Sequence, residues 1–427
     1  MEEQSAHSWT IERLYRNWLI TARTLRNKDT RMEISARIRG FQASPIRRLS
    51  PYARAAKEKG IKVYHLNIGQ PDIKTPQEAI DAVHTYPYGI IAYGESDGDL
   101  PLRKALVKYY KNIGVEIEPK DILITTGGSE ALLFSFMTVC DPDDEIIVPE
   151  PYYTNVHSFA GMANVKIVPV TSVLEDHFAL PPLSTIESKI TKKTMAIVLC
   201  SPNNPTGHVY TPEEYKSILD LCVKHDLFLI VDEVYREFCY DGEVFTSILK
   251  YTDYSDRVIC VDSFSKRFSM CGARVGAIIS RNKNVITETL KLSQARLCPP
   301  SVEQYAALAA LSAPASYMEA VHSEYEKRRD FIVEALQKIP GIKCVKPKGA
   351  FYLIAQLPVE NAEDFAIFML RDFNYNGETV MLAPAEGFYK TPGLGRNQVR
   401  IAYVLNTEDL EKACICLKKG LEAYNNR

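Results

Sequence analysis

The sequence predicts an α/β protein built around a mostly parallel β-sheet, and three observations support this fold class. Short apolar runs alternate with stretches of helical period through the middle of the chain, without long irregular gaps. Most of these runs are continuously apolar, which is typical of parallel strands covered on both faces. The length of 427 residues also exceeds the ~250–300 residues at which a single core stops growing, so we expect two lobes.

The composition argues against several classes of protein. The 51 Lys and Arg residues nearly balance the 53 Asp and Glu residues, so a nucleic-acid partner is not expected. The ten cysteines show neither the paired spacing of a zinc site nor the density of a secreted disulfide scaffold. We therefore expect no metal and a reducing, cytoplasmic compartment. No apolar run approaches the ~20 residues needed to cross a bilayer, so no membrane partner is expected.

Residues 1–31 differ in character from the rest of the chain. They carry five arginines and apolar residues at helical spacing, which favours one short amphipathic helix. Their acidic residues Glu2, Glu3 and Glu12 argue against a targeting peptide. We expect a dispensable extension, with the compact protein beginning near Met32.

The next segment predicts a helix, a strand and a loop. Helical spacing from Pro45 to Gly60 indicates a helix that Gly60 ends. An apolar run from Val63 then enters a Gly/Pro turn, where Gly69 lets the backbone approach a ligand or simply forms the turn. A polar loop that begins at Tyr93 leads into the following helix.

Seven apolar runs follow and form the predicted sheet. Ligands of such sheets bind beyond the carboxyl ends of the strands, so the residues there are the candidates for function. The runs are Ile122–Thr125, Glu145–Val148, Val165–Val168, Met195–Cys200, Leu227–Val231, Val258–Val261 and Gly276–Ser280.

Small and aromatic residues follow the first two runs. Gly127, Gly128 and Ser129 open a helix, and the exposed amides of a helix N-terminus form a cradle for phosphate. Gly-Gly turns before helices are nevertheless common. After the second run, Tyr153 either offers a flat ring to a ligand or packs as an ordinary turn tyrosine.

Polar residues follow the fourth and fifth runs. The turn from Ser201 to Gly207 contains two prolines and a glycine, which would hold Asn204 rigidly for hydrogen bonding. The fifth run ends at Asp232 with Tyr235 close behind, which places a carboxylate and a phenol at the same edge. A helix-capping aspartate is the alternative interpretation of Asp232.

The sixth run ends in a hydroxyl-rich turn that carries Ser263, Ser265 and Lys266, with Arg274 about two helical turns later. Taken alone, Lys266 is best read as a surface lysine. Because polar residues also follow the neighbouring runs, we interpret Lys266 as a covalent catalyst. A lysine attached to an aldehyde cofactor forms a reactive and exchangeable link.

Pyridoxal phosphate (PLP) is the cofactor that these groups suit. Asp232 as an anion would keep the ring nitrogen protonated, and Tyr235 with Asn204 would bind the ring hydroxyl. Tyr153 would stack on the ring. The phosphate would be bound by the amides of Gly128, Ser129 and Glu130, the hydroxyls of Ser263 and Ser265, and Arg274.

The Asn204-Pro205-Thr206-Gly207 turn, Asp232 with Tyr235, and Ser263-x-Ser265-Lys266 followed by Arg274 resemble the class I aminotransferases, fold type I of the PLP enzymes. This resemblance, closest to aspartate aminotransferases, extends from about Pro45 to the C-terminus. It implies a large PLP-binding domain with a mostly parallel seven-stranded sheet, expected at 81–320. A smaller α/β domain is expected from 32–80 and 321–427. It further implies a homodimer with shared active sites, in which Tyr93 reaches the neighbour's phosphate.

One arginine stands within an apolar run near the C-terminus. A guanidinium buried at Arg400 needs an anionic partner, and a structural salt bridge would satisfy it. The resemblance implies instead that Arg400 binds the substrate α-carboxylate, assisted by Asn204 and the amide of Gly69. Arg396 is the competing candidate. The run Lys348–Ile354 reads as a strand that can line a pocket.

Three functions remain open at this point. The first is an aminotransferase that moves an amino group from an L-amino acid to a 2-oxo acid, with aspartate and 2-oxoglutarate as the leading pair. The second is a β-eliminating lyase on the same cofactor, and the third is a non-catalytic PLP-binding regulator. Alanine, aromatic and glutamine-family substrates also stay open. Arg296 and Lys390 are candidates for a distal carboxylate, and position 129 holds serine where some relatives have lysine.

Overall fold

The computed structural model describes residues 34–42 and 44–427, which fall into two units. The first unit contributes a short helix, α2 (Ala36–Arg39). Residues 44–427 belong to the second, compact unit, which contains the sheets and the remaining helices. The predicted extension at 1–31 lies outside the described residues.

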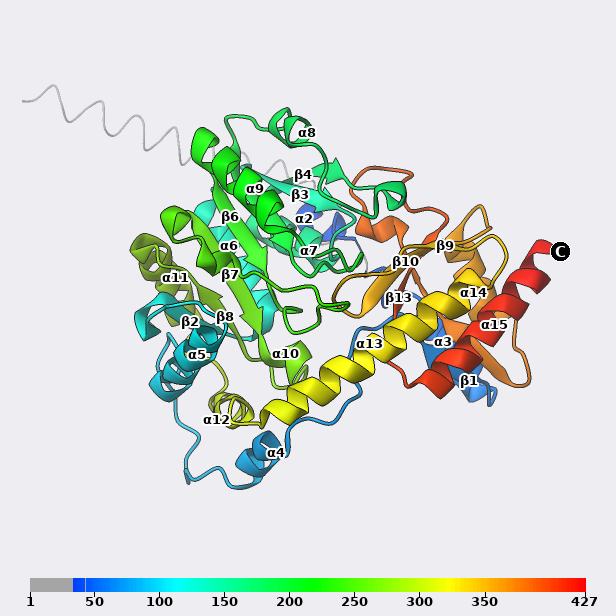
Figure 1. The fold of residues 1–427 in the computed structure, drawn as a ribbon, viewed down its shortest axis with the longest axis horizontal. Coiled ribbons are helices and arrows are strands. Elements are labelled where there is room, and N and C mark those ends of the chain that lie inside the picture. Colours follow the sequence, from blue (N-terminus) through cyan, green and yellow to red (C-terminus); the bar gives the residue numbers. More distant parts are fainter. Residues whose placement is uncertain (1–33, 43) are drawn as a thin grey trace, which may run out of the picture. The chain divides into compact units, whose positions relative to one another are not determined.

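A seven-stranded sheet forms the centre of the larger unit (Figure 1). Its strand order is β2-β8-β7-β6-β5-β3-β4, and only β8 runs antiparallel to its neighbours. The predicted fold class and all seven predicted strands are therefore confirmed. The strands are β2 (Ile122–Thr125), β3 (Glu145–Glu150), β4 (Lys166–Thr171), β5 (Thr194–Cys200), β6 (Phe228–Asp232), β7 (Val258–Ser263) and β8 (Gly276–Ile279).

Helices cover both faces of this sheet, which explains the continuously apolar strands. Along β2, Ile122 and Ile124 face one hydrophobic core and Leu123 faces the other, because successive side chains of a strand point to opposite sides. The first core includes α5 (Leu100–Asn112), α9 (Pro212–His225) and α12 (Ser301–Ala310). The second includes α6 (Gly127–Val139), α7 (Asn155–Ala163) and α11 (Lys283–Arg296).

Two smaller sheets join the ends of the chain. Strand β1 (Lys62–His65) pairs in parallel with β11 (Glu378–Met381), so segments more than 300 residues apart lie side by side. An antiparallel sheet has the order β12-β13-β10-β9. Its strands are β9 (Lys343–Cys344), β10 (Tyr352–Gln356), β12 (Ala383–Pro384) and β13 (Gln398–Ala402).

Helices α3 (Ser50–Glu58), α14 (Ala362–Arg371) and α15 (Thr407–Asn425) pack around these small sheets, while α4 (Gln77–His84) lies against α12. Figure 1 shows the long helix α13 (Ala315–Gln337) running from α12 toward β9 and α15. Since residues 44–427 form one compact unit, the division into domains at 81 and 321 stays a prediction.

Helix α3 begins later than its spacing predicted. Its first residue is Ser50 rather than Pro45, and Pro51 stands in its first turn, where proline is tolerated. Residues 45–49 form turns before it. Gly60 follows the helix with a positive φ of 78°, in agreement with its predicted role as terminator. Within the described part of the chain, no helix is long and apolar enough to span a membrane.

Candidate active site

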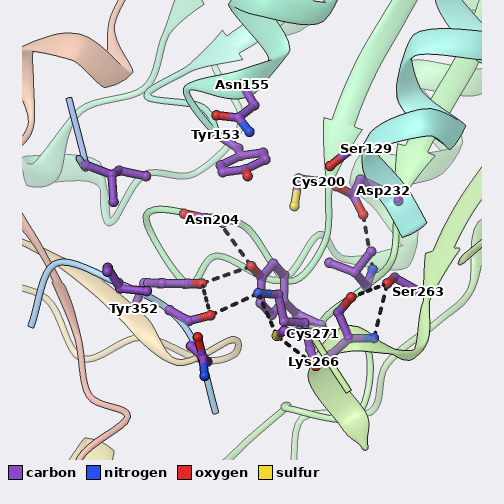
Figure 2. Close-up of a pocket in the computed structure, with 18 of the residues that line it drawn as sticks. Ser129, Tyr153, Asn155, Cys200, Asn204, Asp232, Ser263, Lys266, Cys271 and Tyr352 are labelled. Carbon is purple, nitrogen blue, oxygen red and sulfur yellow. Dashed lines mark hydrogen bonds between the residues drawn. The ribbon is translucent and has the colours of Figure 1, made fainter. Parts of the chain in front are cut away.

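A cavity of about 550 Å³ lies beyond the carboxyl ends of β5, β6 and β7, between these strands and β10 and β13 (Figure 2). It brings together most of the predicted site residues, which come from seven separate stretches of the sequence. The predicted site residues that line it are Gly69, Gly128, Ser129, Tyr153, Asn204, Asp232, Tyr235, Ser263, Ser265, Lys266, Arg274 and Arg400. Glu130 and Tyr93 do not.

Lys266 enters the cavity from the short helix α10 (Phe264–Arg267), which follows β7 directly. The hydroxyl of Ser263 caps this helix by accepting a hydrogen bond from the amide of Ser265 at 3.1 Å. Lys266 Nζ donates to the carbonyl oxygen of Gly69 at 2.9 Å. Burial opposes the charge of Lys266, but Tyr352, Cys271 and Tyr153 outweigh it and raise the pKa of the amine.

Gly69 is a glycine because no larger residue fits against the cavity wall. A Cβ atom on Gly69 would lie 1.7 Å from the hydroxyl of Tyr352. The same carbonyl that accepts from Lys266 lies 3.5 Å from this hydroxyl. The turn after β1 is thereby joined to both β10 and α10.

Asp232 ends β6 and is buried, with 8% of its surface exposed. Its carboxylate accepts a hydrogen bond from the amide of Val234 at 3.2 Å, and no ion pair with it exists among the described residues. Burial raises the pKa of Asp232 to about 7. No helix begins directly after Asp232, so the helix-capping alternative is wrong. A buried carboxyl group without a counter-ion favours its protonated form, which explains the raised pKa.

Tyr235, Asn204 and Tyr352 form a chain of polar contacts in the cavity, of which Figure 2 labels Asn204 and Tyr352. Asn204 Nδ2 donates to the Tyr235 hydroxyl at 3.3 Å, and the two phenol oxygens of Tyr235 and Tyr352 lie 3.0 Å apart. The turn that carries Asn204 is held by the amide of Gly207, which donates to the Asn203 carbonyl at 2.9 Å. The rigid turn predicted from the prolines is thus present.

Arg400 lies on β13 with 1% of its surface exposed. Its Nη1 donates to Asn204 Oδ1 at 3.1 Å and its Nη2 to the Asn67 carbonyl at 2.6 Å, while Nε has no partner. No carboxylate of the described residues lies within ion-pair distance, so the salt-bridge alternative fails. Burial accordingly lowers the pKa of Arg400. Arg396, the competing candidate, does not line the cavity.

The start of α6 and Arg274 form the other end of the cavity. Arg274 donates from Nη2 to the Thr126 carbonyl at 3.4 Å. A Cβ on Gly127 would lie 2.5 Å from that Nη2 atom, so glycine is needed for the guanidinium to approach the helix. Ser263 and Ser265 line the same region, with their hydroxyls 2.9 Å apart.

Two predicted site residues lie elsewhere. The Glu130 carboxylate accepts from the amide of Thr126 at 2.7 Å and pairs with Arg296 at 3.2 Å, so it closes the first turn of α6. Tyr93 is 80% exposed in the loop between α4 and α5. The roles predicted for the Glu130 amide and for Tyr93 stay predictions. Arg296 and Lys390 do not line the cavity either.

Sequence reasoning missed several cavity residues. Tyr352 follows the Lys348-Gly349-Ala350 turn, and the prediction that this strand lines a pocket was the available signal for it. Cys271 lies near Lys266, with Sγ 3.9 Å from Nζ. The other missed residues are Ser44, Ile46, Arg47, Ile68, Gln70, Leu132, Asn155, Cys200 and Val234. Most of these residues do not belong to a recognisable sequence motif, because long-range packing brings them to the cavity.

The chain is similar to proteins of one family along most of its length. A family model described as "Aminotransferase class I and II" matches residues 61–417. An aspartate aminotransferase of Bacillus subtilis is 31% identical, over 92% of this chain and 100% of that protein. An aspartate aminotransferase structure from Thermus thermophilus with maleate has a TM-score of 0.82 at 29% identity, covering 91% and 100%. An alanine aminotransferase structure from Pyrococcus furiosus has a TM-score of 0.83 at 31% identity, covering 92% and 100%.

Proposed function

The chain belongs to the class I and II aminotransferase family, and on that premise we propose that it binds PLP at Lys266 and uses aspartate as its amino donor. A 2-oxo acid such as 2-oxoglutarate would accept the amino group. One observation carries the proposal. Lys266, Asp232 and Arg400 converge on one cavity, and the two latter groups lack a partner of opposite charge among the described residues.

The residues present fit PLP in charge and shape. Asp232 is a buried carboxylate without a cation, which a protonated ring nitrogen would supply. Arg274, two serine hydroxyls and the start of a helix gather at the far end, which is the donor set that a phosphate requires. PLP, when bound, supplies an aldehyde for the amino group and a ring that withdraws electrons from the substrate α-carbon.

Each wall of the cavity would hold a different part of the cofactor. Tyr235 and Asn204, which are hydrogen-bonded to each other, would bind the ring hydroxyl, and the ring of Tyr153 would stack on the cofactor ring. The phosphate would take hydrogen bonds from Ser263, Ser265 and Arg274, and from the amides of Gly128, Ser129 and Glu130.

Substrate binding would rest on Arg400. Its guanidinium lies over the rings of Tyr352 and Phe388, 4.5 and 5.0 Å from their centroids, and these contacts orient it. The unpartnered Nε leaves donor capacity for the substrate α-carboxylate, with Asn204 and the amide of Gly69 alongside. Lys266 Nζ, once neutral and free, would take the proton from the substrate α-carbon.

The names of the relatives support aspartate as the amino donor. The Bacillus subtilis and Thermus thermophilus proteins are aspartate aminotransferases, whereas the Pyrococcus furiosus protein is an alanine aminotransferase. Neither the lyase nor the regulator gains support from these relatives.

We propose a homodimer in a reducing cytoplasm as the working form. The long loop between α4 and α5 exposes Ile90 and Ile91 with 79% and 70% of their surfaces, as well as Tyr93. Apolar side chains exposed together in this way mark an interface. All ten cysteines are free thiols, which supports the reducing compartment.

The test combines attachment and transfer. The protein is loaded with PLP and reduced with borohydride, and the modified peptide is identified by mass spectrometry. Amino transfer from ¹⁵N-aspartate to 2-oxoglutarate is then measured. We expect the label on Lys266, and a loss of transfer of at least about 10³-fold in Lys266→Ala, because the variant has neither the attachment point nor the base.

Lys390→Ala is the matched control, since this lysine lies outside the cavity. It should keep wild-type transfer. Label on another residue, or wild-type transfer by Lys266→Ala, would disprove the covalent role. Release of free ammonia with no ¹⁵N-glutamate would identify the lyase instead.

A further inference from the structure

The segment around Ile46 lies beside Arg400, although neither was predicted to contact the other. Asn67 joins them: its carbonyl accepts from Arg400 Nη2 at 2.6 Å, and its side-chain Nδ2 donates to the Ile46 carbonyl at 2.9 Å. Ile46 also packs in the cluster that contains Phe388, the residue whose ring lies under Arg400. Arg47 is therefore held next to the proposed α-carboxylate subsite.

One of the basic residues that line the cavity has no partner in the proposed function. Its basic residues are Arg47, Lys266, Arg274 and Arg400, and its only acid among the described residues is Asp232. In the proposed function Lys266 carries the cofactor, Arg274 binds phosphate and Arg400 binds the α-carboxylate. Asp232 is taken by the ring nitrogen. Arg47 has no partner in this scheme.

The contacts of Arg47 and its neighbour Arg48 differ. Arg48 Nη2 pairs with Glu363 of α14 at 2.6 Å and does not line the cavity. Arg47 is exposed and lines the cavity, and its side chain makes no hydrogen bond or ion pair with residues 34–42 or 44–427. A free guanidinium at a substrate pocket suits a planar anion, because its fork of donors matches a carboxylate.

We propose that Arg47 selects substrates with an acidic side chain by pairing with the distal carboxylate while Arg400 holds the α-carboxylate. This inference rests on the proposed function and names its substrate class, the dicarboxylic amino and 2-oxo acids. Arg296 and Lys390, the two candidates from the sequence, are engaged or placed elsewhere: Arg296 pairs with Glu130, and neither lines the cavity. Arg47 is a specificity residue and takes no part in the proton transfer.

Single-turnover kinetics of the holoenzyme test the proposal. Each amino acid is mixed alone with PLP-loaded protein, so the second carboxylate of an acceptor does not interfere. Arg47→Gln should lower the rate constant divided by the dissociation constant about 10- to 100-fold for aspartate and glutamate, the range for a hydrogen bond between charged groups. The value for alanine should change less than about twofold. For aspartate and glutamate, the Arg47→Lys variant should give a ratio between those of wild type and Arg47→Gln. Lysine keeps the positive charge but lacks the paired donors of the guanidinium.

Binding of unreactive acids gives a second readout. Arg47→Gln should weaken the binding of succinate, which has two carboxylates, and leave the binding of butyrate unchanged. Arg48→Gln is the control and should match wild type for every compound. An unchanged ratio of aspartate to alanine, or an equal loss for both, overturns the role of Arg47 while the proposed function stands. A wild-type protein that takes nitrogen from no amino acid overturns the proposed function itself.

Discussion

Asp232 occupies a position that suits a carboxylate only when a cation lies beside it. In the cofactor-free chain its pKa of about 7 lies above the ordinary 3.8, so between these values the folded protein holds a proton that the unfolded chain has lost. Stability from this group is therefore present at low pH and is lost as the pH rises through about 7.

Asp232→Asn should remove that dependence in the cofactor-free protein. Relative to wild type, the unfolding free energy of the variant should rise by about 3 kcal/mol between about pH 5 and pH 7, since one pKa unit is worth about 1.4 kcal/mol. Urea unfolding at several pH values measures this difference. If the unfolding free energies of the two proteins change in parallel with pH, the pKa of Asp232 is not raised in the folded protein. With PLP bound the sign should reverse, because the variant loses the partner of the ring nitrogen.

Replacing Arg400 should affect all amino-acid substrates to a similar extent. Arg400→Gln should raise KM for every amino acid about 10²- to 10³-fold, because it removes the proposed charged pair with the α-carboxylate in a buried site. Steady-state kinetics with aspartate, alanine and an aromatic donor measure the effect. Arg396→Gln is the control and should leave KM unchanged. If KM instead rises for Arg396→Gln and stays unchanged for Arg400→Gln, Arg396 is the residue that binds the α-carboxylate.

At the scale of elements, the turn that carries Lys266 is fastened by a buried ion network. Asp262, 1% exposed at the end of β7, accepts from Arg267 at 2.6 Å and from the Tyr110 hydroxyl at 2.9 Å, and it pairs with Arg236 at 3.2 Å. Burial opposes its charge, but Arg236 and Arg267 outweigh it and lower the pKa of Asp262. Arg267, the residue next to the proposed catalytic lysine, is thereby fixed to the sheet.

Asp262→Asn should lower the unfolding free energy by about 3–5 kcal/mol, because it leaves two buried guanidinium groups without their anion. Denaturant unfolding measures the loss. Asp220→Asn on α9 is the matched control: it breaks an exposed pair with Lys216 and should cost at most about 1 kcal/mol. A loss of similar size in both variants would mean that the buried network does not stabilise the turn.

The strands were predictable and the helix boundaries less so. Continuous apolar runs located β2 and β5 to within a residue, because burial on both faces leaves little room for polar residues. Helix α3 was predicted five residues too early, since the spacing of Ile46 and Leu49 resembles a helix. Leu49 is buried against α14, whereas Ile46 packs toward the active site, and only the packing distinguishes the two.

At the scale of the whole molecule, the exposed loop before α5 predicts the oligomeric state. Replacing Ile90 and Ile91 together by glutamate should convert a dimer to a monomer and reduce transamination, because charges would replace apolar contacts at the interface. Analytical ultracentrifugation and the transfer assay measure both effects. Val244→Glu is the control, because Val244 is 81% exposed in a different loop. Wild-type sedimentation and activity of the double variant would disprove this interface.

The sequence alone determined the sheet and the residues at its strand ends. Asp232 ends β6, while Asn204 and Lys266 lie in the turns after β5 and β7, and parallel strands bring their carboxyl ends to one edge. Local periodicity and turn chemistry are short-range properties, so they can be read from neighbouring residues.

Only the tertiary structure decided which distant residues complete the site. The pairing of β1 with β11 and the hydrogen bonds of Asn67 bring Gly69, Ile46 and Arg400 together from opposite ends of the chain. No periodic pattern encodes such contacts, because they arise from packing between segments that are far apart in the sequence. Arg47 became a candidate, and Arg296 ceased to be one, for this reason.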